Sequence, residues 1–165
     1  MQKKIALIGA AGVGKTSLVR RFVSSLFDDK YLTTIGVKVE KKVVQAAGID
    51  VTLMLWDIAG AEEHFSIPSA YIRGAAGYLL VLDGTRPDTI VTAEALNAQI
   101  ARDVGRLPHV VVINKADLPL AMAADDQAVR ALGGLSVLVT SAKTGDGVER
   151  AFVQLAEAVV SDLPR

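Results

Sequence analysis

Short apolar runs alternate with stretches of helical periodicity along the whole chain of 165 residues. Residues 79–82 and 110–113 are entirely apolar, which is typical of strands buried on both faces of a parallel sheet. The pattern predicts strands at residues 3–9, 37–47, 50–57, 77–83, 109–114 and 136–140, with helices near residues 15–26, 63–74, 89–104, 125–132 and 146–161. Such alternation of strands and helices indicates an α/β protein.

The second and third predicted strands depart from this alternation. Only residues 46–50 join them, which is too short for a parallel crossover and predicts an antiparallel hairpin. Lys38, Glu40 and Lys41 make the first of the two strands charged, as expected of a solvated edge. We therefore expect a six-stranded, mostly parallel sheet with one antiparallel edge strand and helices on both faces. Ligands of such a sheet bind beyond the carboxyl ends of its strands.

A glycine-rich segment, residues 9–16, lies between the first predicted strand and the first predicted helix. Glycines let backbone amides close on a polyphosphate, and a helix start directs its N–H groups and positive dipole end at the same anions. Lys15 would reach the β and γ phosphates of a nucleoside triphosphate, and the Thr16 hydroxyl would ligate Mg²⁺. Without the flanking strand and helix, the segment would equally fit a glycine-rich turn. The predicted phosphate-binding residues here are Gly9, Ala10, Ala11, Gly12, Val13, Gly14, Lys15, Thr16 and Ser17.

Asp57 and Gly60 follow the third predicted strand at the same edge of the sheet. The Asp57 carboxylate would hold Mg²⁺ through a water molecule. The Gly60 N–H would bind a γ phosphate, because a residue without a side chain permits the close approach. Taken alone, an aspartate at a strand end more often caps a turn or a helix; the phosphate loop upstream reverses that preference.

Two further polar segments, residues 114–117 and 141–143, follow the fifth and sixth predicted strands. Asp117 would accept both N–H groups of a guanine edge, with the Lys115 stem along the base plane and the Ala142 N–H donating to the guanine carbonyl. Adenine has the opposite pattern and would leave the carboxylate buried and unpaired, at a cost of roughly 3–5 kcal/mol. The predicted guanine-binding residues of these two segments are Asn114, Lys115, Asp117, Ser141, Ala142 and Lys143.

In their order and spacing, these motifs resemble those of the Ras-superfamily small GTPases over essentially the whole chain. Residues 34–37, 55–57 and 71–77 are most similar to the Rab branch. The resemblance implies a single P-loop GTP-binding domain over residues 1–165. It also implies a molecular switch that cycles between GTP and GDP forms and hydrolyses GTP to GDP and phosphate with Mg²⁺.

The resemblance further implies the roles of several residues in the first switch and in catalysis. Phe27 would pack against the guanine, and Tyr31 would belong to the first switch. The Thr34 hydroxyl would ligate Mg²⁺ while its N–H reaches the γ phosphate. The implied metal ligands are Thr16, Thr34 and Asp57, and the implied catalytic positions are Lys15, Thr34, Gly60 and Ala61.

The chain departs from the family pattern after Gly60, where Ala61 replaces the glutamine that orients the attacking water. A methyl group neither donates nor accepts a hydrogen bond. Leu32 stands where some relatives keep an arginine finger in cis, and the Ala11 methyl projects toward the γ phosphate, where it would crowd an incoming finger. We therefore expect slow hydrolysis without help.

Three explanations of Ala61 stay open. An activating protein supplies the missing groups; Glu62, Glu63 or His64 substitutes for the glutamine; or Ala61 is an engineered change that traps the GTP state. The rival function is a non-hydrolysing, GTP-bound interaction module. An adenine-nucleotide kinase is disfavoured, because residues 114–117 and 141–143 would then lack a purpose.

Composition narrows the partners and the compartment. Eighteen basic residues balance eighteen acidic ones, so we expect no nucleic-acid partner and no charge-driven membrane binding. The absence of cysteine and of any signal-peptide or spanning pattern predicts no direct membrane anchor in this chain and a cytoplasmic location. We expect a monomer, with activating, exchange and effector proteins that contact residues near 28–38 and 58–72.

Overall fold

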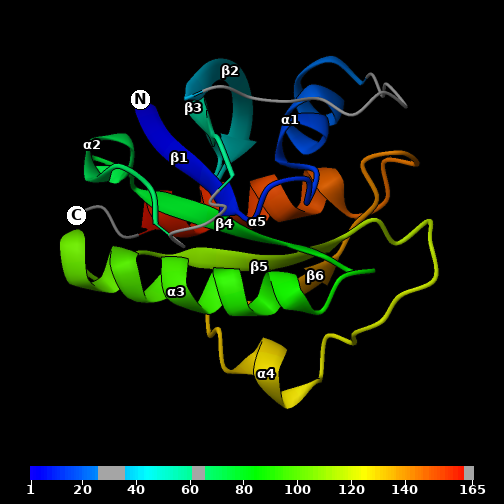
Figure 1. The fold of residues 1–165 in the computed structure, drawn as a ribbon. Coiled ribbons are helices and arrows are strands. Elements are labelled where there is room, and N and C mark those ends of the chain that lie inside the picture. The colour runs from blue at the N-terminus through cyan, green and yellow to red at the C-terminus, as the bar shows by residue number, and fades with distance from the viewer. Residues whose placement is uncertain (26–35, 61–65, 162–165) are drawn as a thin grey trace.

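The computed structural model describes residues 1–25, 36–60 and 66–161. Within these ranges a central sheet carries helices on both faces (Figure 1). The elements in chain order are β1 (Gln2–Gly9), α1 (Lys15–Ser24), β2 (Val37–Ala46), β3 (Ile49–Ile58), α2 (Ser69–Ile72), β4 (Gly77–Asp83), α3 (Asp88–Asp103), β5 (His109–Asn114), α4 (Gln127–Arg130), β6 (Val137–Val139) and α5 (Val148–Ser161).

The sheet has six strands in the order β2-β3-β1-β4-β5-β6. All neighbouring strands are parallel except β2 and β3, which pair antiparallel from Val37 opposite Ile58 to Ala46 opposite Ile49. This architecture confirms the predicted mostly parallel sheet with one antiparallel edge strand. The parallel strands end at one edge of the sheet, where the loops that follow them meet.

Two hydrophobic clusters, one on each face, hold the sheet in place. One cluster packs α1 and α5 against the sheet, and Phe22 of α1 stacks on Phe152 of α5 with ring centroids 4.2 Å apart. The other cluster packs α3 on the opposite face, with Ile72 of α2 and Val129 of α4 beside it. β4 is buried along its whole length, in agreement with the apolar run at residues 79–82.

Several predicted elements are longer than those observed. The helix expected near residues 63–74 is limited to α2 among the described residues, because Pro68 disfavours a helical backbone at Ile67. The helix expected at 125–132 shortens to α4, which passes into a tight turn before Gly133 and Gly134, both at positive φ. The last strand spans Val137–Val139 rather than residues 136–140.

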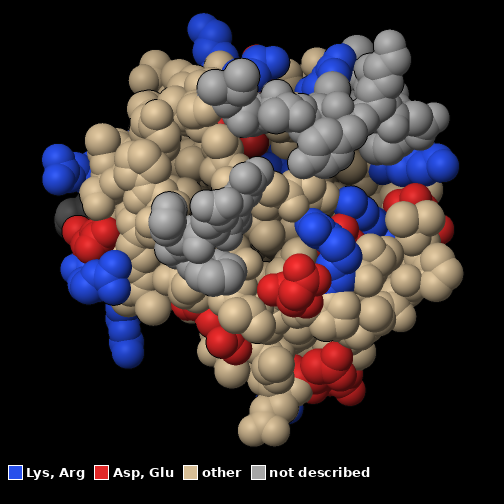
Figure 2. Space-filling model, viewed as in Figure 1, with Lys and Arg blue, Asp and Glu red and all other residues tan. Residues whose placement is uncertain are grey.

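The described residues contain no helix with the length and apolarity needed to cross a bilayer. On the face shown in Figure 2, acidic and basic side chains are interspersed. This mixture agrees with the balanced net charge of the sequence.

The hairpin between β2 and β3 stores backbone strain that a substitution should relieve. Its two connecting residues, Ala47 and Gly48, have φ values of 52° and 78°, as a type I′ turn requires. We expect Ala47→Asn to raise the free energy of unfolding by about 0.5–1 kcal/mol, because asparagine tolerates the left-handed region. Gly48→Ala, whose methyl would meet no atom within 4 Å, should lower it by about 1–2 kcal/mol. Urea unfolding measures both, and equal effects of the two variants would contradict the strain account.

Candidate functional site

The predicted phosphate loop runs from the end of β1 to the start of α1. Gly14 precedes the helix at φ 103°, and a Cβ atom there would lie 2.3 Å from Asn114 Nδ2. Both the backbone conformation and the space therefore require glycine. The Lys15 side chain is buried and curls over the loop, with Nζ donating to the carbonyl oxygens of Gly9 at 3.2 Å and Ala10 at 3.0 Å. Carbonyl oxygens of the predicted phosphate loop thus surround the Lys15 ammonium group.

The surroundings of Lys15 destabilise the charged form of its side chain. Burial lowers the pKa of its ammonium group from 10.5 to about 8; Asp57 opposes this shift and Arg86 adds to it. A nearby anion favours the charged form of a buried cation, so its attraction would offset the desolvation that lowers the pKa of Lys15. The electrostatics of the loop therefore favour a bound polyanion.

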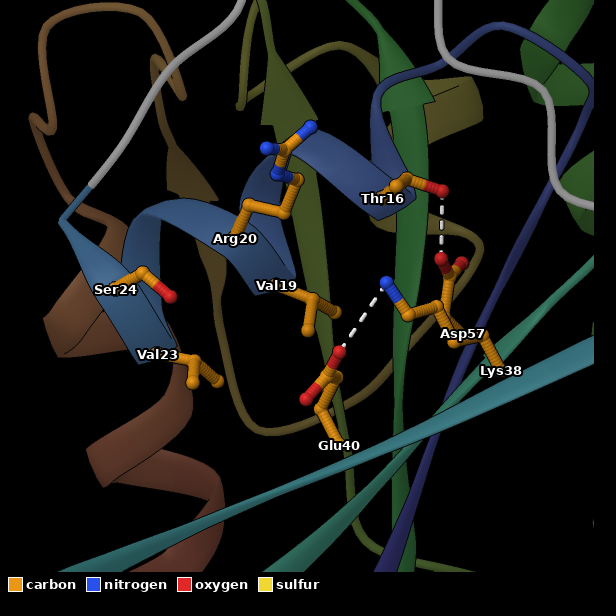
Figure 3. A pocket seen from close by; sticks show the side chains of 8 residues that line it. All are labelled: Thr16, Val19, Arg20, Val23, Ser24, Lys38, Glu40 and Asp57. Atoms are coloured by element: carbon orange, nitrogen blue, oxygen red, sulfur yellow. Dashed lines mark hydrogen bonds and ion pairs between the residues drawn. The ribbon is translucent and has the colours of Figure 1, made fainter.

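Thr16 of α1 and Asp57 of β3 meet beside this loop. The Thr16 hydroxyl donates to Asp57 Oδ2 at 2.6 Å, and Figure 3 shows the two groups pointing at each other. Two hard oxygen ligands suit Mg²⁺, which binds few protein groups and takes its other ligands from phosphates and water. Among the described residues no group of three or more His, Asp or Glu side chains could hold a metal ion.

A small cavity lies next to Thr16 and Asp57, between α1 and the hairpin (Figure 3). Its volume of about 20 Å³ is enough for about one water molecule. An ion pair between Lys38 Nζ and Glu40 Oε1, 3.2 Å long, borders it. The cavity therefore has room for about one water molecule beside the Thr16–Asp57 pair, on the side of the edge strand β2.

Gly60 comes close to the phosphate loop from the end of β3. A Cβ atom at Gly60 would lie 2.4 Å from both the N and the Cα atom of Ala11. Any side chain at this position would force the two segments apart, so only glycine permits the observed approach. The geometry brings the Gly60 backbone to the part of the loop where a terminal phosphate is expected.

Asn114, at the end of β5, connects three segments of the site. Its side chain is buried, and Nδ2 donates to the Val13 carbonyl at 3.0 Å. Its Oδ1 accepts hydrogen bonds from Thr140 Oγ1 at 3.1 Å and from the Ala142 N–H at 3.3 Å. One amide therefore joins the phosphate loop to the segment after β6. The expected donation from Ala142 to a guanine carbonyl stays a prediction.

The remaining predicted base-binding residues lie around Asn114. Asp117 accepts a hydrogen bond from the Ser141 hydroxyl at 2.8 Å, which fixes its carboxylate. Lys115 has φ 69°, a strained conformation of the kind that clusters at functional sites. Its Nζ lies 2.9 Å from Asp83 Oδ2. Lys143 is exposed, and its carbonyl accepts a hydrogen bond from Arg21.

Sequence reasoning missed three charged residues that hold the site together. Arg21 of α1 donates through Nε to the Ala142 carbonyl at 2.7 Å, which fixes the segment after β6 to the helix. Asp83 and Arg86 follow β4, and Arg86 reaches the phosphate loop. The rule that found Asp57 and Asn114, polar residues after a buried strand, would also have found Asp83.

The structure brings together most of the predicted site residues at one edge of the sheet, on the ends of β3 and β5, the start of α1 and the adjoining loops. Ser17 lies half-buried in the first turn of α1. The positions outside the described residues are Phe27, Tyr31, Leu32, Thr34, Ala61, Glu62, Glu63 and His64. Their predicted roles stay predictions.

Comparisons with a family model and with known proteins point to the same protein family. The model of the Ras family matches residues 4–161. The chain is similar to Ras-related protein Rab-1D of Dictyostelium discoideum, with 34% identity over 164 residues that cover 97% of this chain and 80% of the relative. It is also similar to Ras-related protein SEC4 of Saccharomyces cerevisiae, with 37% identity over 161 residues that cover 94% of this chain and 74% of the relative.

Burial of Lys15 predicts an unusual pH dependence of stability in the ligand-free protein. Its pKa is about 8 in the folded chain and 10.5 as the ordinary value. Between these two values the unfolded chain binds more protons than the folded one, so stability rises with pH in this window. We expect the free energy of unfolding to rise by about 1–2 kcal/mol from about pH 8 to about pH 9.5.

Chemical denaturation of the ligand-free chain at the two pH values measures this effect. Lys15→Met keeps the length of the side chain without its charge, so this control should lose the rise. An equal rise in the control would assign the effect to other groups.

Proposed function

The chain belongs to the Ras family of small GTPases, in its Rab branch, and from that premise we propose a GTP/GDP switch whose own hydrolysis is slow. The observation that carries this proposal is the Asn114 side chain, which joins the phosphate loop to the segment after β6. A protein that binds the base and the phosphates of one nucleotide needs the two binding segments held in fixed positions, and the hydrogen bonds of Asn114 hold them so. The proposed domain spans residues 1–165.

In the proposed reaction, water attacks the γ phosphorus of GTP and the bond to the β–γ bridging oxygen breaks, which gives GDP and phosphate. The protein does little covalent chemistry in such a transfer, so its contribution is to position the reactants and neutralise charge. Lys15 would bind the β and γ phosphates in exchange for the carbonyl oxygens it now contacts. The backbone amides of the phosphate loop and of Gly60 would bind the remaining phosphate oxygens.

Mg²⁺ would be held by Thr16 and Asp57, with Thr34 as a further ligand. The ion, when bound, neutralises charge on the β and γ phosphates. The 2.6 Å contact between Thr16 and Asp57 supports this assignment, because it brings two hard oxygen atoms together next to Lys15. Asp57 would act through a water molecule, and the Thr16 hydroxyl would act directly.

The proposed switch follows from contacts that only a γ phosphate provides. Thr34 and Gly60 would bind it, so that residues near 28–38 and 58–72 are ordered with GTP and released after hydrolysis. Effectors, an exchange factor and an activating protein would read these segments. The close approach of Gly60 to Ala11 supports the part of this mechanism that concerns Gly60.

Guanine specificity gives the first test of the proposed function. We expect Asp117→Asn to weaken GDP binding by two to four orders of magnitude, because the amide no longer accepts both N–H groups of the base. Xanthosine diphosphate, whose ring has a carbonyl in place of the amino group, should regain much of the affinity. Competition against a fluorescent nucleotide measures both affinities.

The matched control is Ser141→Ala. It removes the hydroxyl that donates a hydrogen bond to Asp117 but leaves the Asp117 carboxylate, which would bind the base, unchanged. It should weaken guanine and xanthine nucleotides alike. Preferential binding of ATP by the unchanged protein would instead support an adenine-nucleotide enzyme.

The residue after Gly60 gives the second test. We expect Ala61→Gln to speed single-turnover GTP hydrolysis by about tenfold or more, since a side chain that orients the attacking water is restored. GDP affinity should change little, and Ala61→Leu serves as a control of similar bulk without hydrogen-bonding groups. No increase in rate with glutamine would contradict both the role of this position and the trapping explanation of Ala61.

Nucleotide content after purification separates the switch from its rival. Mostly GDP favours an enzyme that turns over, and mostly GTP favours a persistent GTP-bound interaction module. Chromatography of the released nucleotide gives the answer directly.

A further inference from the structure

The loop between β4 and α3 brings a second cation to the phosphate loop. Arg86 lies in this loop, 75 residues after Ala11, yet its Nη2 donates to the Ala11 carbonyl at 2.7 Å. Ala11 lies in the middle of the predicted phosphate-binding segment, on the side that Gly60 approaches. The guanidinium is therefore placed beside the part of the loop where the terminal phosphate is expected.

A buried carboxylate orients this arginine. Asp83 is 1% exposed, and its Oδ2 lies 3.0 Å from Arg86 Nε and 2.9 Å from Lys115 Nζ. Thr85 donates to Oδ1 through both its N–H at 2.8 Å and its hydroxyl at 2.6 Å. Burial alone would raise the pKa of Asp83, but the hydrogen bonds from Thr85 and Lys115 outweigh it and keep the pKa below its ordinary value. The carboxylate is thus a fixed anion.

The backbone around Arg86 is also held in place. Its N–H donates to the Asp83 carbonyl at 3.0 Å, and its own carbonyl accepts from the Thr89 N–H at 3.1 Å and from the Thr89 hydroxyl at 2.7 Å. Pro87 follows with φ −59°, so the loop has little freedom. A cation that is already in position stabilises a developing negative charge more than a cation that has to be ordered first, because no free energy is spent on ordering it during the reaction.

The guanidinium still has capacity for a ligand. Its side chain is 42% exposed, and within the described ranges its Nη1 has no hydrogen-bond acceptor. The positive charge of Arg86 acts on Lys15, whose pKa it helps to lower. Two cations that face one loop and repel each other are stabilised together by a shared polyanion.

We propose that Arg86 is a catalytic arginine in cis, which contacts the γ phosphate of GTP and neutralises the charge that builds up during hydrolysis. This inference rests on the proposed GTPase function. As water attacks the γ phosphorus and the bond to the bridging oxygen breaks, the electron pair moves to GDP. Arg86 would stabilise that charge by donating hydrogen bonds, while the proton of the water leaves with phosphate or to solvent. Its position near Ala11 would compensate in part for Leu32 and Ala61.

The alternative role of Arg86 is structural, since the same contacts brace the Ala11 carbonyl against Asp83. The two roles differ in what a substitution changes. A brace affects the stability of the loop and the affinity for GDP and GTP alike. A catalytic cation affects the rate of the bound complex and its transition-state analogue.

The experiment compares Arg86→Ala and Arg86→Lys with Arg130→Ala, an exposed arginine of α4. Single-turnover hydrolysis of bound GTP should fall by about tenfold or more in Arg86→Ala, since loss of one charge-stabilising donor has effects of that order or larger. Arg86→Lys should keep part of the rate, because it keeps the charge without the fork. The affinity for GDP should change by less than about threefold in all three variants.

A second measurement does not depend on turnover. Binding of aluminium fluoride to the GDP complex, followed with a fluorescent GDP analogue, should weaken in Arg86→Ala and stay unchanged in Arg130→Ala. This measurement also decides the case if hydrolysis by the unchanged protein is too slow to follow.

The possible outcomes of these measurements are distinguishable. An unchanged rate and unchanged aluminium fluoride binding in Arg86→Ala would overturn the catalytic role, as would a loss of GDP and GTP affinity in equal measure together with a normal rate per bound GTP. Failure of the unchanged protein to bind guanine nucleotides at all would instead refute the proposed function. A selective loss of rate and analogue binding supports the proposal.

Discussion

The hydrogen bonds of the Asn114 amide are the interaction on which the rest of the site depends. β5 and the phosphate loop are far apart in sequence, and β5 does not pair with β1, because β4 lies between them. The amide bridges that gap by donating to the Val13 carbonyl and accepting from the Ala142 N–H. Gly14 is required for the same reason, since a Cβ atom there would collide with the amide nitrogen. The glycine pattern of the loop is thus set partly by a side chain 100 positions later.

The ion pairs of Asp83 form a second network, in addition to the hydrogen bonds of Asn114. Asp83 lies at the end of β4 with Lys115 on one side and Arg86 on the other, so it connects the segment predicted to bind the base with the predicted phosphate loop. Lys15 has no carboxylate partner of this kind within hydrogen-bond distance among the described residues. A bound polyphosphate would complete this arrangement, since it supplies the negative charge that Lys15 lacks.

Much of the fold and of the site was predictable, because both depend on local patterns. Continuous apolar runs located β4 and β5, and the short connection at residues 46–50 located the antiparallel pair. Polar residues after these strands located Asp57, Asn114 and Asp117. What the sequence could not predict depends on distant contacts: Arg86 and Arg21 reach loops more than 70 residues away. The start of the short helix α2 after Pro68 has a local cause that the periodicity alone did not show. A charged residue in a loop has no local pattern that indicates its partner.

Binding and turnover rest on different parts of this chain. The groups expected to hold a guanine nucleotide are on rigid elements: Lys15 and Thr16 begin α1, and Asn114 ends β5. Their positions are fixed by burial and by hydrogen bonds that exist without a ligand. Position 61, where the family resemblance leads us to expect a water-orienting glutamine, is alanine, so tight binding would not by itself imply fast hydrolysis. A cation held on a fixed loop, as Arg86 is, would add to catalysis without the movement that a switch segment requires. In such a protein the lifetime of the GTP form would depend on how well fixed charges stabilise the transition state of hydrolysis without a water-positioning side chain.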